Sequence, residues 1–188
     1  MKRRVAMLMV HTCPLEQAGI GDAGGMNIYV AESAARMAAQ GVEVDIFTRR
    51  DHLDLPAVVE LSPGVNVHHL DAGHDLHWTK EQVPAHFKEL STEFKKALSG
   101  DRRYDLIHSH YWLSGKVAMP VAKELKLQLV HTMHTMARVK NLSLAEGEIP
   151  EPMIRVQGET QIVAAASALT ANTDAEAASL VSLYEACP

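Results

Sequence analysis

Short apolar runs alternate along this chain with longer segments in which apolar residues recur at helical spacing. The apolar runs predict six strands, at Arg4–His11, Glu43–Arg49, Val65–Leu70, Asp105–His110, Gln128–His134 and Ala168–Asn172. The helical spacing predicts five helices, at Gly25–Gln40, Thr79–Leu98, Leu113–Leu125, Glu151–Ala166 and Asp174–Ala186. We expect loops at Asp51–Gly64 and Leu142–Pro152.

Two local features support these elements and indicate how they pack. Thr79 with Gln82 and Thr173 with Glu176 have capping-box spacing, which marks helix starts. Several strands, among them VAMLMV and LQLV, are apolar on both faces, as in a parallel sheet that helices cover on both sides. Alternating strands and helices form right-handed βαβ units. The sequence therefore predicts a Rossmann-like, doubly wound α/β domain.

Composition narrows the class of protein. A chain of 188 residues is long enough for one domain with its own core. The net charge of −5 argues against binding to nucleic acid or to an anionic membrane. Cys13 and Cys187 lie far apart and form no CxxC motif, so we expect a cytoplasmic protein without disulfides. The apolar stretch Val5–Val10 is too short for a signal peptide or a membrane span, which favours a buried first strand.

Five of the eleven histidines lie in or after predicted strands near the carboxyl ends, namely His11, His108, His110, His131 and His134. Ligands bind at this edge of open α/β sheets. Each imidazole alone can simply satisfy local backbone groups, but the burial of so many polar groups together favours a polar ligand site. A metal site is the alternative, with His108, His110 and a third ligand from His131 or His134. No acidic residue stands in either segment, so we expect no metal.

A glycine-rich loop precedes the first predicted helix. Gly19, Gly21 and Gly24 formally spell GxGxxG, but about seven residues separate the loop from its strand, and Thr48-Arg49-Arg50 stands where a dinucleotide site needs an acid. We therefore do not expect a nicotinamide or flavin cofactor. Gly24 and Gly25 come directly before the helix, where bare backbone N–H groups suit a phosphate or a carbohydrate hydroxyl.

Four segments in this order, GDAGGMNIYV, YDLIHSHYWLSG, HTMHTMARVKN and ANTDAEA, make the chain recognisable. It resembles the N-terminal domain of retaining glycosyltransferases of the GT-B fold, above all those of mycothiol biosynthesis that act on inositol phosphate. Sucrose-phosphate synthases share the Gly-Gly loop but are more distant. The resemblance covers essentially all 188 residues. It implies that residues 1–188 are an acceptor-binding domain and that the nucleotide-sugar domain of the family is absent from this chain.

The resemblance implies an activity and its partners. Enzymes of this kind transfer N-acetylglucosamine from a UDP-sugar to 1D-myo-inositol 3-phosphate with retention at the anomeric carbon. The UDP-sugar is a co-substrate, so no resident cofactor is expected in this domain, and the family tends to form homodimers through it. Without the donor domain, we expect the chain to bind acceptor but not to catalyse transfer. The alternatives are a domain of a transferase related to sucrose-phosphate synthase, or a free-standing phosphosugar-binding module without catalysis.

The resemblance also assigns roles to individual residues. The acceptor phosphate is expected on four side chains, those of Lys80, Tyr111, Thr135 and Arg155. Asn27 is expected to bind inositol hydroxyls, and His134 is expected beside the donor sugar as the one catalytic residue. Gly24 and Gly25 would face the donor sugar and its diphosphate.

The residues alone say less about the two cations of this set. Lys80 falls in the first turn of a predicted helix, where a lysine is usually solvated. Arg155 falls near a helix start, where a positive charge opposes the helix dipole, a cost that a bound anion would offset. Spacing does not unite these residues with Tyr111 and Thr135; the resemblance does.

Overall fold

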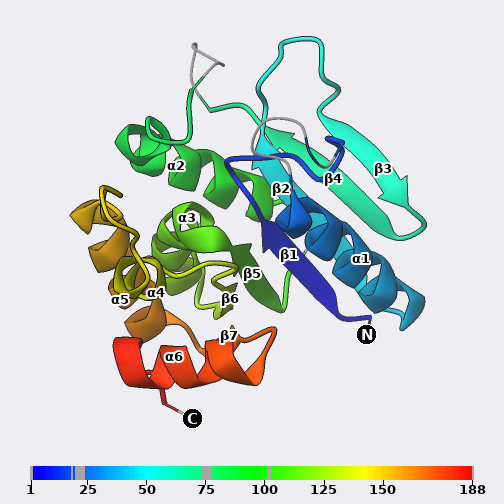
Figure 1. Cartoon of the computed structure of the whole chain (residues 1–188). Coiled ribbons are helices and arrows are strands. Elements are labelled where there is room, and N and C mark those ends of the chain that lie inside the picture. The colour runs from blue at the N-terminus through cyan, green and yellow to red at the C-terminus, as the bar shows by residue number, and fades with distance from the viewer. Residues whose placement is uncertain (1, 18, 20–23, 73–77, 101–102, 188) are drawn as a thin grey trace.

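The computed structural model describes residues 2–17, 19, 24–72, 78–100 and 103–187. It contains a seven-stranded sheet in the order β3-β4-β2-β1-β5-β6-β7 (Figure 1). All neighbouring strands are parallel except the edge pair of β3 and β4. The strands are β1 (Arg4–Leu8), β2 (Glu43–Arg49), β3 (Val58–Ser62), β4 (Val65–Leu70), β5 (Leu106–His110), β6 (Gln128–Thr132) and β7 (Ala168–Thr170).

Six α-helices and one 3-10 helix surround this sheet in the part of the chain that the structure describes. The helices are α1 (Gly25–Ala39), η1 (Val83–His86), α2 (Phe87–Leu98), α3 (Tyr111–Leu125), α4 (Ala137–Leu142), α5 (Met153–Ala165) and α6 (Asp174–Tyr184). The prediction of a Rossmann-like, doubly wound α/β domain is confirmed.

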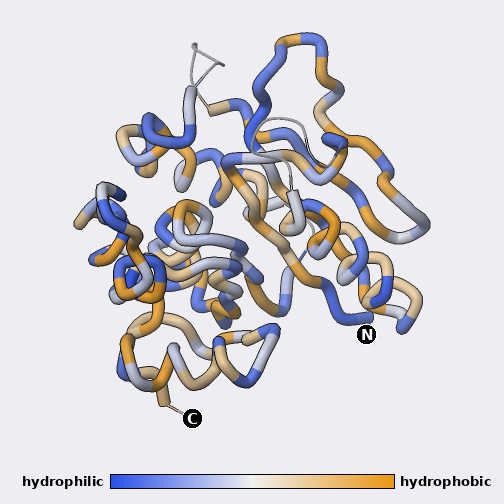
Figure 2. Tube along the Cα trace, in the orientation of Figure 1, coloured by the Kyte–Doolittle hydropathy of each residue, from blue (hydrophilic) through white to orange (hydrophobic). Residues whose placement is uncertain are grey.

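The alternation of side chains along β1 explains why helices cover both faces of the sheet. Ala6 and Leu8 pack in one apolar core with residues of α2, α3 and α5, whereas Val5 and Met7 pack in another with α1. Figure 1 accordingly shows α1 apart from α2 and α3. In Figure 2 the hydrophilic N-terminal residues give way to hydrophobic colour along β1. Burial on both faces explains why β1 is apolar at every position from Val5 to Leu8.

One predicted loop is in part a strand. Asp51–Gly64 contains β3, which pairs antiparallel with β4 at the edge of the sheet and has an irregular register between Glu60 and Ser62. The residues of β3 are exposed or partly buried, so the segment lacks the continuous apolar run of the central strands. The prediction of a loop throughout this segment was therefore wrong.

The predicted helix Thr79–Leu98 begins later than expected. Residues 80–82 form a turn, η1 follows, and the α-helix starts only at Phe87. The backbone N–H of Thr79 does donate to the Gln82 side chain (2.7 Å), but this contact closes a turn before η1 rather than the start of an α-helix. The placement of Lys80 in the first turn of a helix was wrong. At Thr173 the predicted cap is confirmed, since its hydroxyl accepts the N–H of Glu176 (3.1 Å).

The end of one central strand and the start of one helix also differ from the predicted bounds. The strand predicted to run to His134 ends at Thr132, and the helix predicted from Leu113 begins already at Tyr111. The backbone turns sharply at these points, because Tyr111 and His134 both have left-handed conformations, with φ of 68° and 61°. The short helix α4 was not predicted. Each of these turns lies at the carboxyl edge of the sheet, where the candidate site is found.

Candidate functional site

A cavity of about 490 Å³ lies at the carboxyl edge of the sheet. Three of the four residues that the sequence predicts for an acceptor phosphate line it, namely Lys80, Tyr111 and Arg155. The fourth, Thr135, contacts Arg155 directly. These four residues come from the turn before η1, the start of α3, the loop after β6 and the first turn of α5. The fold thus brings together residues that are up to 75 positions apart in sequence, from Lys80 to Arg155.

Arg155 is the centre of this arrangement. Its side chain is 3% exposed, and its Nη2 donates to the carbonyl oxygen (3.1 Å) and the hydroxyl (2.9 Å) of Thr135. Its Nη1 pairs with Glu151 (2.9 Å) and its Nε with Glu159 (2.7 Å). Burial acts to lower the pKa of Arg155, but the hydrogen bond to Glu159 and the neighbouring negative charges raise it above its ordinary value. The guanidinium is therefore charged and held on three sides.

The two carboxylates were not predicted, and they change the interpretation of Arg155. We expected a bound anion to offset the unfavourable position of this cation near a helix start, but Glu151 and Glu159 already do so. Both lie four residues from Arg155, one on each side. That i, i+4 spacing is a signal in the sequence from which the ion pairs could have been found.

Tyr111 joins Arg155 to the histidines. The guanidinium carbon of Arg155 lies 5.0 Å from the centre of the Tyr111 ring, within range of a cation–π contact. Tyr111 also contacts the His11 ring, at 4.6 Å between centroids. The left-handed backbone of Tyr111 is unfavourable for a bulky residue, and such conformations concentrate at functional sites. Burial, and after it the positive charges of Lys80, His134, Arg155 and Arg49, lower the pKa of His11 to about 3.

Aromatic stacking anchors the segment that bears Lys80. The Trp78 ring lies parallel to the His86 ring at 3.5 Å between centroids, and the guanidinium carbon of Arg49 lies 5.2 Å from the Trp78 ring centre. An Arg49 nitrogen also donates to the Trp78 carbonyl oxygen (3.3 Å). These contacts hold Trp78 in place two residues before Lys80, which lines the cavity.

His134 lies beside the same edge of the sheet and pairs with another histidine. Its Nε2 is 3.0 Å from Nδ1 of His110, so one ring donates a hydrogen bond to the other. Tyr29 of α1 meets the His134 ring edge-on at 5.1 Å. Burial lowers the pKa of His134 to about 4, and burial followed by the charges of His108, His134 and His131 places the pKa of His110 well below its ordinary value. Both rings are neutral at pH 7.

The remaining two histidines of the predicted cluster lie on opposite faces of the sheet. His108 bonds to the Thr132 hydroxyl (2.8 Å) and contacts the His110 ring at 4.2 Å, on the face of α1. His131 is 0% exposed and bonds to Ser109 (2.8 Å) on the face of α3. Adjacent strand residues point to opposite faces. The expectation that all five histidines converge on one crevice was therefore wrong for His131.

Asn27 is 2% exposed, and its amide nitrogen donates to the Thr12 hydroxyl (2.9 Å) and to the Cys13 carbonyl oxygen (2.6 Å). In this structure Asn27 therefore ties the loop after β1 to α1. Its assignment to inositol hydroxyls stays a prediction.

The two glycines before α1 have no packing role in the described structure. Gly24 is the N-cap of α1 and Gly25 its first residue, and a Cβ atom built on either would meet no heavy atom within 4 Å. Neither has a positive φ. Because packing does not require glycine here, open space beside the backbone is what these residues provide. The N–H of Gly24 donates to Oδ1 of Asn27 (3.4 Å). Gly21 of the GxGxxG pattern lies outside the described residues.

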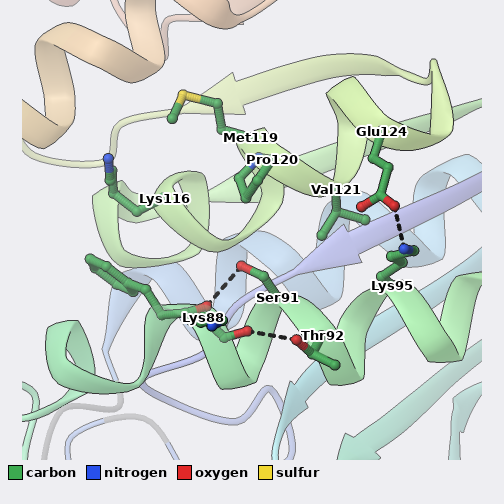
Figure 3. A pocket seen from close by; sticks show the side chains of 10 residues that line it. Lys88, Ser91, Thr92, Lys95, Lys116, Met119, Pro120, Val121 and Glu124 are labelled. Carbon is green, nitrogen blue, oxygen red and sulfur yellow. Dashed lines mark hydrogen bonds and ion pairs between the residues drawn. The ribbon is translucent and has the colours of Figure 1, made fainter.

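Two other observations bear on alternative sites. Among the described residues, no three side chains of His, Cys, Asp or Glu are grouped so that they could hold a metal ion. A cavity of about 510 Å³ lies between α2 and α3, where Lys95 pairs with Glu124 (Figure 3). None of the residues assigned by the resemblance lines it.

Within the described residues, no helix is long and apolar enough to cross a membrane.

Two curated proteins similar to this chain have the same name. D-inositol 3-phosphate glycosyltransferases from Streptomyces scabiei (strain 87.22) and Kineococcus radiotolerans are 56% and 51% identical to it over 188 residues. These matches cover 99% of this chain but only 42% and 43% of the relatives. The chain thus spans less than half the length of the curated relatives that it matches.

Solved structures of glycosyltransferases are similar to this chain as well. A sucrose-phosphate synthase from Thermosynechococcus elongatus superposes with a TM-score of 0.89 at 30% identity, over 97% of this chain and 45% of that one. The catalytic domain of starch synthase IV from Arabidopsis thaliana, solved with ADP and acarbose, shares the fold alone, with a TM-score of 0.56 at 17% identity over 98% of this chain and 49% of that one. The predicted fold, one half of a GT-B glycosyltransferase, is confirmed. The model of the glycosyl transferase 4-like domain matches residues 24–186, and the chain belongs to that family.

Proposed function

We propose that this chain is the acceptor-binding domain of a retaining glycosyltransferase that transfers N-acetylglucosamine from a UDP-sugar to 1D-myo-inositol 3-phosphate. The observation that carries the proposal is the cavity lined by Lys80, Tyr111 and Arg155, with Thr135 bonded to Arg155. The relatives named D-inositol 3-phosphate glycosyltransferase support the choice of acceptor.

The cavity suits a phosphate monoester. Lys80 and Arg155 supply positive charge, and the hydroxyl groups of Tyr111 and Thr135 supply neutral donors. Charge-assisted hydrogen bonds of this kind are about twice as strong as neutral ones. His134 and Thr135 line a second cavity, of about 320 Å³, which shares Lys140 with the first. A sugar ring attached to the phosphate would extend past Thr135 towards this second cavity and the histidine.

The reaction that we propose needs no protein nucleophile. The bond between the anomeric carbon and the UDP oxygen breaks, a hydroxyl oxygen of the acceptor bonds to that carbon on the same face, and the hydroxyl proton passes to the departing diphosphate. Residues of this chain contribute position and electrostatics: the acceptor site aims the hydroxyl, His134 borders the donor sugar, and the N–H groups near Gly25 face the diphosphate. We propose that the part of the relatives not matched here supplies the other donor contacts.

Calorimetric titration tests the proposal. The chain is expected to bind 1D-myo-inositol 3-phosphate more tightly than unphosphorylated inositol. Lys80→Ala should weaken the phosphorylated ligand by roughly 1.5–3 kcal/mol, the range for hydrogen bonds to charged groups, and leave inositol unchanged. Lys88→Ala is the matched control, because Lys88 lines the cavity between α2 and α3 instead. Equal binding of both ligands by the unaltered chain would contradict the proposed acceptor.

A second candidate follows from the structural similarity to the sucrose-phosphate synthase. In that case the same phosphate site would take a hexose phosphate in place of inositol 3-phosphate. A competition titration with both ligands distinguishes these acceptors. A transfer assay on the full-length protein then distinguishes either enzyme from a phosphosugar-binding module without catalysis.

A further inference from the structure

Glu159 is a buried carboxylate that no step of the proposed function uses. It is 0% exposed and lies on α5, one turn after Arg155. Its Oε1 accepts the Nε–H of Arg155 (2.7 Å). Its Oε2 accepts the backbone N–H of Ala137 (2.9 Å) and also the hydroxyl of Tyr184. Three donors from three different helices thus converge on one carboxylate.

These contacts connect the phosphate site to a rigid part of the fold. Tyr184 packs in an apolar cluster with Met133, Met136 and Leu180, and its hydroxyl also accepts the N–H of Arg138 (3.1 Å). Burial, and after it the hydrogen bond to Glu159, raise the pKa of Tyr184. The tyrosine therefore stays a donor to Glu159 at neutral pH, and the carboxylate is fixed from the side opposite Arg155.

We propose that Glu159 is a positioning residue for the phosphate site, which fixes the Arg155 guanidinium so that Nη1 and Nη2 meet Glu151 and Thr135 at the wall of the cavity. With Nε held by Glu159, the guanidinium plane is set, and Nη2 can reach both oxygens of Thr135. The guanidinium carbon also lies 5.0 Å from the centre of the Tyr111 ring. One carboxylate thereby aligns three of the four residues assigned to the phosphate. This inference rests on the proposed function.

Charge alone would give Glu159 the opposite effect. A carboxylate beside Arg155 opposes the approach of a phosphate, so its removal would strengthen phosphate binding if electrostatics decided the outcome. Positioning makes the reverse prediction. The amide of Glu159→Gln has one acceptor oxygen where the carboxylate has two, and three donors compete for it. Arg155 then loses its fixed partner and phosphate binding weakens.

The experiment measures affinity for 1D-myo-inositol 3-phosphate and for inositol by calorimetry. We expect Glu159→Gln to weaken the phosphorylated ligand at least tenfold and to change inositol binding less than twofold. Glu159→Asp keeps the charge but withdraws it by one methylene, and it should act in the same direction. Tyr184→Phe is the comparison: it removes one of the two contacts of Oε2 and leaves the bond between Oε1 and Arg155, so thermal stability should fall while the preference for phosphate falls much less than in Glu159→Gln.

The outcomes separate this inference from the proposed function. If the unaltered chain shows no preference for the phosphorylated ligand, both fail. If it shows the preference and both Glu159 variants keep it within twofold, or bind phosphate more tightly, the positioning role alone is overturned. A loss of the preference in Tyr184→Phe as large as in Glu159→Gln would also overturn it, as would a failure of both Glu159 variants to fold, since either result would make the residue structural.

Discussion

Arg155 contacts Glu151, Glu159, Thr135 and Tyr111, and each of these contacts depends on the shape of the guanidinium. Nε, Nη1 and Nη2 go to Glu159, Glu151 and Thr135 respectively, and the guanidinium carbon lies 5.0 Å from the centre of the Tyr111 ring. An ammonium group has the same charge but neither the fork nor the face. Charge and geometry can therefore be separated at this position.

We expect Arg155→Lys to weaken binding of 1D-myo-inositol 3-phosphate by tenfold or more, although the net charge is unchanged, because lysine cannot engage two carboxylates and Thr135 at once. Calorimetric titration of the variant measures this. Arg36→Lys, on an exposed part of α1, serves as the control and should bind like the unaltered chain. Full retention of affinity in Arg155→Lys would show that a point charge suffices.

The second prediction at residue scale concerns Gly25. A valine there would place its side chain in open space, so the thermal unfolding midpoint should shift little, while transfer by the full-length protein should fall below detection because the backbone N–H groups are screened from the diphosphate. Gly41→Val is the contrasting variant. Its φ of 86° strains valine, so stability should fall while the site is untouched. Normal transfer by Gly25→Val would remove the glycine loop from the donor site.

At the scale of residues, the sequence predicted the members of the phosphate site better than the side chains that bond to them. The family resemblance assigned the phosphate to Tyr111, Thr135 and Arg155, which the structure brings together. The i, i+4 spacing could have predicted the ion pair of Arg155 with Glu159, but not the burial of Glu159, which depends on the packing of α4, α5 and α6 around it. The left-handed backbone of Tyr111 was equally hidden, since it depends on how β5 meets α3.

At the scale of elements, α3 and α5 approach each other closely at two glycines. A Cβ atom on Gly115 would lie 2.5 Å from Cδ1 of Ile162 and 2.9 Å from Cε1 of His131. One on Gly158 would lie 3.0 Å from Cε3 of Trp112, the residue after Tyr111. The close approach of the two helices sets the distance between Tyr111 and Arg155, which lie near their N-terminal ends.

We expect Gly115→Ala to lower the free energy of unfolding by about 1–3 kcal/mol, the usual cost of overpacking a core, because the methyl group meets Ile162 and a buried ring with no room to retreat. Urea denaturation measures the change. Gly100→Ala adds the same atom where nothing lies within 4 Å and should leave stability almost unchanged. A neutral Gly115→Ala would mean that the two helices can move apart.

The buried central strands could be predicted from the sequence, whereas the partly exposed edge strand and the shortest α-helix could not. The central strands β1, β2, β5 and β6 are largely buried and each contains at least two consecutive apolar residues, and the sequence predicts each of them. The edge strand β3 is partly exposed and lacks that pattern, and α4 has only six residues, too few for a helical period to show. Lys80 was misplaced because the residues before α2 fold as a turn and a 3-10 helix, which share local signals with an α-helix.

At the scale of the whole molecule, buried histidines make stability depend on pH. Burial is the largest cause that lowers the pKa to about 3 for His11 and His131 and to about 4 for His108 and His134, and it places that of His110 well below the ordinary 6.5. Below pH 6.5 these side chains bind protons in the unfolded chain but not in the folded one. Folding stability is therefore lost as the pH falls from 6.5 towards 4.

We expect the free energy of unfolding to decrease between pH 6.5 and 4.5 with a slope of several protons, each about 1.4 kcal/mol per pH unit. Urea denaturation at half-unit steps of pH measures the slope. His131→Gln should reduce the slope by about one proton. Asp45, whose pKa falls to about 2 mainly through hydrogen bonds to His68 and Tyr104 that outweigh its burial, loses its contribution only below this window. A flat profile would show that the histidines are protonated in the fold.

The contacts that hold Arg155 before any ligand arrives have a thermodynamic consequence. A long, flexible side chain normally loses about 2 kcal/mol of rotamer entropy when a ligand immobilises it. Here Glu151, Glu159 and Thr135 restrict the guanidinium in the folded chain itself, so most of that loss belongs to folding and little to binding. An acceptor phosphate would therefore meet a receptor that is already rigid, and its association would be limited by diffusion and desolvation rather than by rearrangement of the arginine.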